Sequence, residues 1–315
     1  MFICLAAFFV SVITASISYT TKKIIMNAKE NGKKKFIKYA EFNLTFEMLE
    51  DAMKEDIASE SKINWIRALA YLSAKYGGNF RKYKKRDLLQ YVQKIKLEEN
   101  PESTLKNLKL FDYYKKIYTA VLGNFLGYLS TGKYGLKVFS PIAKNFSFSH
   151  YNDFGARRSF GGDRRHLGHD LMCIIGTPVI AVESGSVRQF GWNMYGGWRI
   201  GIESVDEENG VVRYWYYAHL RKDKPFQSGL KEGTKVNAGD VIGYVGKTGY
   251  SSKENVNNIS KSHLHIGLQL IFDESQRNGT NEIWIDLYAI TKLLNRNRSE
   301  VVKDLETKEF NRLLS

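Results

Sequence analysis

The chain has 315 residues, enough for two ordinary domains, and its hydrophobic content of 43% with 13% aromatic residues excludes an intrinsically disordered protein. Its formal net charge of +14 favours a polyanionic neighbour, such as anionic lipid, nucleic acid or a bacterial wall polymer. No nucleic-acid-binding motif accompanies the charge, so we expect no nucleic-acid partner. With two cysteines the chain cannot be a disulfide scaffold.

The N-terminal 1–21 segment is predicted to be a signal anchor or a cleaved signal peptide. Residues 2–18 are nearly all apolar or small, and a stretch of this length can just span a bilayer. Residues 22–39 are rich in lysine and are interpreted as a basic juxtamembrane linker. The positive-inside rule would keep such a linker in the cytoplasm, which argues against export of the downstream residues.

Residues 40–132 predict a helical domain. Thr45 is a candidate N-cap, and Gly77 and Gly78 are candidate helix terminators. The apolar residues follow helical spacing over residues 46–57, 63–76, 88–95 and 114–128. No catalytic signature accompanies them, so we interpret this region as a spacer or a partner-binding module.

The pattern changes after a linker at residues 133–149. Residues 150–290 are rich in glycine and β-branched residues and predict an antiparallel all-β domain. The predicted strands include residues 178–182, 185–190, 199–202, 211–217 and 240–246, and Asn209-Gly210 predicts a hairpin turn. A basic helical tail is predicted over residues 291–315. The fold class is therefore α+β multidomain, with an apolar anchor, a helical spacer and a C-terminal β domain.

Five of the six histidines fall between residues 166 and 265. His166 and Asp170 are four residues apart, while His263 and His265 would project from the same face of a strand. His219 lies in another strand-like run. Two imidazoles and a carboxylate, with one position left for water, form the ligand set of a catalytic zinc ion. The remaining imidazoles are natural proton carriers.

Residues 150–290 resemble the lysostaphin-like, or LytM-type, zinc metallopeptidases that cut peptidoglycan peptides. The motifs that carry this resemblance are, in chain order, His166-x-x-x-Asp170, Gly176-Thr177-Pro178-Val179, Gly185-Ser186-Val187, Tyr195-Gly196-Gly197, Tyr217-Ala218-His219-Leu220, Val236-x-Ala238-Gly239-Asp240-x-Ile242-Gly243, Val245-Gly246-x-Thr248-Gly249 and His263-Leu264-His265. The resemblance implies that His166, Asp170 and His265 bind Zn²⁺. It also implies that His219 and His263 are catalytic and act on the metal-activated water and the developing oxyanion.

The function implied is that of a zinc-dependent endopeptidase that hydrolyses cross-bridge or stem peptides of bacterial peptidoglycan. The expected partners are these peptides, anionic wall polymers, and the membrane through the N-terminal segment. We expect the protein to be anchored in the cell membrane on its outer side, or secreted to the wall. The alternatives are a catalytically silent scaffold or activator of other wall hydrolases, and a binding domain stabilised by zinc.

Several other residues have two interpretations. His169 competes with His166 as a ligand, but we expect it at the surface or behind the ligands, and His150 to be structural. Arg158 either lines the substrate groove or forms a surface salt bridge. Tyr195 and Trp198 are either groove walls or core residues. Three further expectations are that Cys173 lies in a buried strand, that Trp284 packs under the sheet, and that the polar insertion at residues 250–261 shapes the cleft.

Overall fold

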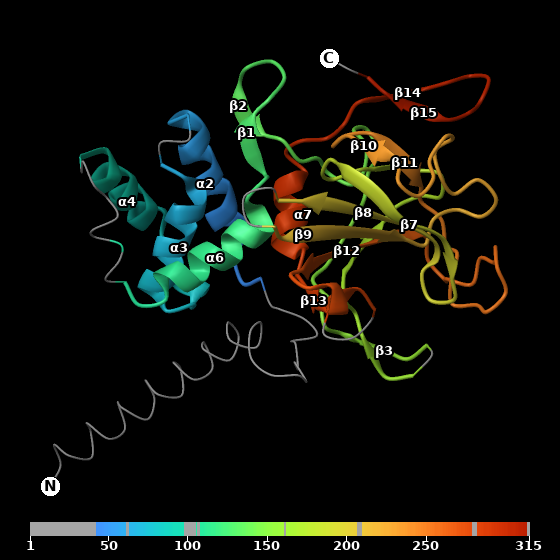
Figure 1. The fold of residues 1–315 in the computed structure, drawn as a ribbon, viewed down its shortest axis with the longest axis horizontal. Helices are drawn as coiled ribbons and strands as arrows, with labels where there is room; N and C mark the ends of the chain where they lie inside the picture. Colours follow the sequence, from blue (N-terminus) through green and yellow to red (C-terminus); the bar gives the residue numbers. More distant parts are fainter. Residues whose placement is uncertain are drawn as a thin grey trace, which may run out of the picture.

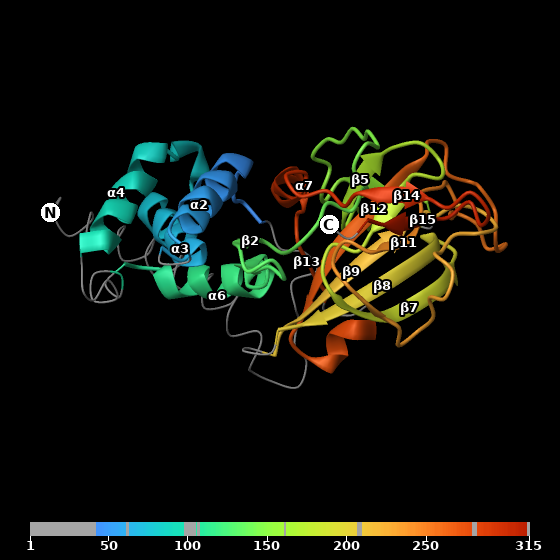
Figure 2. The same ribbon diagram turned by 90° about the horizontal axis from the view of Figure 1, so that it is seen from above.

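The computed structural model describes residues 42–60, 63–97, 105, 108–160, 162–206, 210–278 and 282–313. The predicted anchor at residues 1–21 and the basic linker at residues 22–39 lie outside these ranges, as does Asn209 of the predicted hairpin turn. Within the described ranges, no helix is long and apolar enough to cross a membrane. A helical part and a β-sheet part lie side by side (Figures 1 and 2).

The helical part contains four α-helices among its described residues, at α2 (Phe46–Ala58), α3 (Trp65–Tyr76), α4 (Lys85–Leu97) and α6 (Phe111–Leu122). The predicted caps are confirmed: Thr45 Oγ1 accepts a hydrogen bond from the Met48 amide, and Gly77 ends α3 at a φ of 58°. Apolar residues at helical spacing face inward, and Met48, Leu69 and Leu88 are fully buried.

The helix predicted over residues 114–128 ends earlier than expected. Gly123 and Asn124 follow Leu122 and are poor helix formers, so the chain turns there. The next residues form strand β1 (Leu126–Tyr128), which pairs with β2 (Tyr134–Leu136). Residues 133–149, predicted to be a linker, are packed rather than free, because Val138 and Ile142 are buried.

The predicted antiparallel β domain is confirmed. Its main sheet has the order β10-β7-β8-β9-β12-β13, with β5 pairing with β12 at one end. The bounds are β5 (His169–Met172), β7 (Gly185–Asn193), β8 (Gly197–Val205), β9 (Val212–Ala218), β10 (Lys235–Val236), β12 (His263–Ile271) and β13 (Ile283–Trp284). A smaller sheet pairs β6 (Pro178–Ile180) with β11 (Val241–Tyr244), and a ribbon pairs β3 (Arg157–Arg158) with β4 (Arg164–Arg165).

Alternation along the central strands separates a core face from a functional face. Leu264, Ile266 and Leu268 of β12 are fully buried in the core. The intervening residues of β12, beginning with His263 and His265, therefore project from the other face. Trp284, expected to pack under the sheet, instead packs against this other face and lines the cleft, and a Cβ added at Gly267 would lie 2.5 Å from its ring. Glycine in β12 thus permits the close approach of a large aromatic side chain.

The C-terminal segment differs from the predicted helical tail. Within residues 282–313, only α7 (Tyr288–Leu294) is helical, and β14 (Val301–Lys303) then pairs with β15 (Phe310–Arg312) as a hairpin. The helix ends at Leu294, three residues before Asn297. The side-chain Nδ2 of Asn297 donates to the carbonyls of Leu136 and Val138 at 3.2 and 2.9 Å. Tertiary hydrogen bonds therefore override the local helical pattern.

A buried polar network joins the two parts. Arg213 of β9 is fully buried and donates from Nε to both carboxylate oxygens of Glu183 at 3.1 Å. Its Nη1 donates to the Ala120 carbonyl in α6 at 3.2 Å, and Asn124 donates to Glu183 at 3.0 Å. The same arginine also pairs with Asp206 at 3.3 Å. The helical part is consequently tied to the sheet by charged groups that water does not reach.

Candidate metal centre and active site

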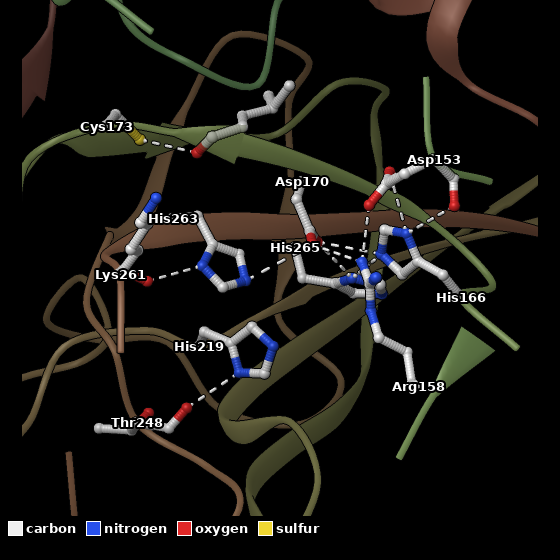
Figure 3. A network of polar contacts seen from close by, with 11 residues as sticks. Asp153, Arg158, His166, Asp170, Cys173, His219, Thr248, Lys261, His263 and His265 are labelled. Atoms are coloured by element: carbon white, nitrogen blue, oxygen red, sulfur yellow. Dashed lines mark hydrogen bonds and ion pairs between the residues drawn. The ribbon is translucent and has the colours of Figure 1, made fainter. Parts of the chain in front are cut away.

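Three predicted ligands converge on one point. His166 Nε2 lies 3.0 Å from both Asp170 Oδ1 and His265 Nδ1, and His265 Nδ1 lies 3.0 Å from the same carboxylate oxygen (Figure 3). Within the described residues, His166, Asp170 and His265 form the group that could hold a metal ion. Tetrahedral zinc ligands with bonds of about 2.0–2.1 Å lie roughly 3.3 Å apart, so this triangle needs only a slight expansion to take the ion.

Strand register brings the ligands together. Asp170 of β5 pairs directly with His265 of β12, and Ala218 of β9 pairs with His265 on the other side. His166 precedes β5 and reaches the same point. A Cβ at Gly168 would lie 2.6 Å from Cε1 and Nε2 of His265. Glycine between His166 and β5 therefore leaves space for the imidazole of His265.

The carboxylate of Asp153, which the sequence did not indicate, contacts the ring nitrogen of His166 that faces away from the other two ligands. Asp153 Oδ1 lies 3.1 Å from His166 Nδ1, while Asp153 Oδ2 accepts from Arg158 Nη2 at 2.7 Å. Arg158 Nη2 also donates to Asp170 Oδ2 at 3.0 Å. A metal-binding histidine usually donates its second ring N–H to such a group, which fixes the orientation of the ring. Asp153 lies in an irregular loop 13 residues upstream, where no spacing rule identifies it.

The charges of the triangle favour a cation. Burial alone would raise the pKa of Asp170, but hydrogen bonds with His166 and His265 hold it well below its usual range. Burial would lower the pKa of His166, yet Asp153 and Asp170 raise it to about 9. The pKa of His265 is lowered chiefly by burial. An ionised carboxylate beside two imidazole nitrogens only 3.0 Å apart suits a shared Zn²⁺.

His219 and His263 lie beside this triangle with one ring nitrogen already engaged. His219 Nδ1 is 2.9 Å from the Thr248 carbonyl, and His263 Nδ1 is 2.8 Å from the Lys261 carbonyl (Figure 3). Each Nδ1 therefore carries the hydrogen, and each Nε2 is available. The two ring centroids are 4.8 Å apart, and His263 Nε2 lies 3.7 Å from Asp170 Oδ1.

The backbone of His219 is strained in a way that presents its side chain. Its φ is +59°, a left-handed conformation that costs free energy for a residue with a side chain. The Gly196 carbonyl accepts from the His219 amide at 2.7 Å, and the Gly246 amide donates to the His219 carbonyl at 3.0 Å. Burial also moves the pKa of His219 well below its ordinary value, so the ring is neutral at pH 7.

The triangle opens onto a cleft of about 680 Å³ that runs along the functional face of the sheet. His166, Asp170, His219 and His265 line it. Arg158 lines the cleft, as one of its two interpretations expected, and its ion pairs are with Asp153 and the buried Asp170 rather than with a surface group. Tyr195 is a wall of the cleft, whereas Trp198 packs against the core. From the insertion at residues 250–261, Tyr250 reaches the cleft.

His169 and Cys173 differ from the expectations. Of the two positions expected for His169, the surface position is wrong, because the residue is fully buried and its Nε2 lies 2.7 Å from His150 Nδ1. Burial and the neighbouring His150 lower the pKa of His169 to about 3. It points away from the triangle because alternate residues of β5 face opposite sides. Cys173 is buried as predicted, but β5 ends at Met172, and Ile174 is 71% exposed.

Comparisons with known proteins find similar sequences over the β domain. Residues 164–278 match Peptidase family M23. The L-Ala–D-Glu endopeptidase of Bacillus subtilis (strain 168) is 31% identical over 189 residues, which make up 58% of this chain and 54% of that protein. Lysostaphin of Staphylococcus simulans is 42% identical over 102 residues, 32% of this chain and 17% of that protein. The chain thus spans about half the length of the first relative and less of the second.

A solved structure supports the fold over a longer range. The crystal structure of a putative glycyl-glycine endopeptidase LytM from Ruminococcus gnavus ATCC 29149 superposes with a TM-score of 0.55 and 24% identity. The superposition covers 81% of this chain and 89% of that one, so it extends beyond the β domain. At this identity the likeness concerns the fold alone.

Proposed function

We propose that the protein is a zinc-dependent endopeptidase that hydrolyses peptide bonds of bacterial peptidoglycan, because residues 164–278 form a peptidase family M23 domain. The observation that carries this proposal is the triangle of His166, Asp170 and His265, which borders a cleft together with His219. Three protein ligands with an accessible side distinguish a catalytic zinc site from a structural site closed by four protein ligands.

The ligand atoms would be His166 Nε2, Asp170 Oδ1 and His265 Nδ1. Zinc bound there would supply Lewis acidity, which polarises a peptide carbonyl and lowers the pKa of a coordinated water towards about 7. Asp153 and Arg158 hold the ligands in place through His166 Nδ1 and Asp170 Oδ2. This preorganisation avoids moving charged side chains during the reaction.

His219 and His263 would manage the proton and the developing negative charge. Each holds Nδ1 against a backbone carbonyl, so each directs Nε2 to the site. Such a nitrogen can take a proton from the attacking water and return it to the leaving amine. Once protonated, it can donate a hydrogen bond to the oxyanion.

The scaffold alternative has less support. A family member that has lost activity would lack one of these groups, whereas all three candidate ligands and both further histidines are present and close together. The alternative of a zinc-stabilised binding domain would need a fourth protein ligand in place of the accessible side.

Digestion of purified cell walls tests the proposal. The full chain, loaded with zinc, should release peptide-linked wall fragments whose new termini are identified by mass spectrometry. The Asp170→Ala variant and the zinc-depleted protein should release none. Intact peptide bonds after incubation with the loaded wild type would contradict the proposed activity, even if wall binding persisted.

We also propose that the peptidase acts outside the cytoplasm, held at the membrane by residues 1–21 or secreted to the wall. The support is an apolar N-terminal sequence, and the charge of +14 would favour contact with anionic wall polymers. Protease treatment of intact protoplasts should digest residues 42–313. Protection until lysis would place the peptidase inside, away from cross-linked wall, and would contradict both export and the wall substrate.

A further inference from the structure

The ribbon of β3 and β4 carries four arginines, of which Arg158, Arg164 and Arg165 line the cleft. Arg157 pairs with Asp163 at 3.0 Å, and Arg158 pairs with Asp153 and Asp170. Arg164 and Arg165 form no ion pair with a carboxylate among the described residues, and Arg165 donates from Nη1 to the Gly155 carbonyl at 3.1 Å. Within the described residues, Arg164 donates one hydrogen bond, from Nε to the Phe160 carbonyl at 2.8 Å.

Aromatic rings hold the guanidinium of Arg164 in place. Its Cζ lies 4.5 Å from the ring centroid of Tyr195 and 5.8 Å from that of Tyr250. Phe160 stacks on Tyr250, with centroids 4.6 Å apart and an angle of 16° between the rings. Cation–π contact and ring packing therefore restrict this long side chain before any ligand binds. A prealigned guanidinium loses little conformational entropy when it binds an anion.

One donor of Arg164 is left over. Its Nη2 is buried and has no hydrogen-bond partner in the described structure. A buried N–H without a hydrogen-bond partner is unfavourable, so such a group beside a cleft points to a ligand or water that would accept its hydrogen bond. Arg164, Tyr195 and Tyr250 line the same cleft as His166 and His219.

The cations at the other end of the cleft are already neutralised. Arg188 pairs with Glu203 at 3.2 Å, and Arg277 pairs with Glu203 and with Glu274. An anionic ligand there would have to displace a protein carboxylate. A carboxylate that binds Arg164 would displace no protein carboxylate. The part of the cleft beside β3 and β4 is therefore the more favourable place for a substrate carboxylate.

We propose that Arg164 binds a free carboxylate of the substrate near the cleaved bond, and so selects acidic stem peptides over neutral glycine bridges. This inference rests on the proposed peptidase function and adds its substrate class. A guanidinium group can donate two parallel N–H hydrogen bonds to the two oxygens of a carboxylate. A carboxamide and a glycine backbone carry no negative charge, so they bind the guanidinium group more weakly.

The aromatic cluster also limits where that carboxylate lies. Tyr250 is next to Arg164 at 5.8 Å and next to His219, with ring centroids 5.8 Å apart. An extended peptide advances about 3.3–3.6 Å per residue, so the acidic residue lies at most about three positions from the cleaved bond. A carboxylate further along the peptide would not reach Arg164 while the bond lies beside His219.

The test compares two stem peptides that differ only in whether D-Glu carries a free α-carboxylate or a carboxamide, with pentaglycine as a third substrate. For the wild type we expect kcat/KM to be about 10- to 100-fold higher for the carboxylate peptide, as a charge-assisted hydrogen bond allows. Arg164→Gln should abolish the difference, and Arg164→Lys should retain part of it. Thermal unfolding shows whether each variant remains folded.

Arg157→Gln is the matched control. It removes the same charge from the same ribbon but lies outside the cleft lining, so the preference should be unchanged. Calorimetric binding of both peptides to zinc-loaded His263→Ala protein gives a readout that does not depend on turnover. Equal affinity for the two peptides, or a preference that survives in Arg164→Gln, would overturn the inference.

The outcomes also separate this inference from the proposed function. Equal cleavage of both stem peptides, or preferred cleavage of pentaglycine, rejects the role of Arg164 and leaves the peptidase standing. If the wild type cleaves no peptide and no wall, the peptidase proposal fails. The binding measurement with His263→Ala then still decides whether Arg164 recognises a carboxylate.

Discussion

Asp170 and His265 lie directly opposite each other in the antiparallel pair of β5 and β12, with 3.0 Å between Oδ1 and Nδ1. The backbone register alone brings these side chains together, although 95 residues separate them in the chain. A shift of one residue would turn one partner to the opposite face of the sheet. The metal centre therefore depends on the alignment of these two strands.

The first prediction concerns metal content. The purified protein should bind one zinc ion per chain, and His166→Ala, Asp170→Ala and His265→Ala should each remove most of it, because two ligands hold zinc poorly. Elemental analysis after dialysis measures this. His150→Ala is the control, since His150 contacts His169 rather than the triangle. Full zinc occupancy in all three ligand variants would show that the assignment is wrong.

The second prediction separates proton transfer from metal binding. His219→Ala and His263→Ala should keep their zinc but lose about 10²- to 10⁴-fold in kcat, the usual contribution of a general acid or base. Each variant is assayed for both metal and wall hydrolysis. Activity near that of the wild type would exclude the catalytic role. Loss of zinc would instead place that histidine among the ligands.

The third prediction concerns Asp153, which supports His166 Nδ1 and Arg158. Asp153→Ala should weaken zinc binding by about 10- to 100-fold, the usual cost of losing such a supporting carboxylate. Competition with a zinc chelator measures the affinity. Asp163→Ala removes the same charge from an exposed pair on the adjacent ribbon and should have little effect. If both variants bound zinc like the wild type, Asp153 would have no orienting role.

The fourth prediction concerns the junction of the two parts. Glu183→Gln removes a negative charge that neutralises the fully buried guanidinium of Arg213. The variant should therefore lower the free energy of unfolding by about 3–5 kcal/mol. Urea denaturation of the zinc-loaded protein measures it. The double variant Glu183→Leu with Arg213→Met should lose less, because no buried charge remains unpaired. Disrupting the exposed pair with Asp163→Asn should cost at most about 1 kcal/mol.

The sequence predicted the candidate site well because its signals are local. His263 and His265 share a face through the two-residue period of a strand, and the motifs around His166, Asp170 and His219 occur in one recognisable order. The caps of the first helices could also be predicted from the sequence, since Thr45 and Gly77 form hydrogen bonds with backbone groups only a few residues away. Such features depend on neighbours in the chain, which the sequence displays directly.

Other features were decided only by the tertiary structure. The C-terminal hairpin replaces a predicted helix because Asn297 bonds to residues 136 and 138, which lie far away in the chain. Asp153 supports His166, and Arg164 lies between aromatic rings, through loops that have no periodic pattern. The sequence by itself therefore predicted the β-sheet-rich C-terminal part, the helices of the N-terminal part, and the five side chains that the structure brings together. The supporting carboxylate of Asp153, the position of Arg164 in the cleft and the C-terminal hairpin depend on packing between distant segments, which no local spacing encodes.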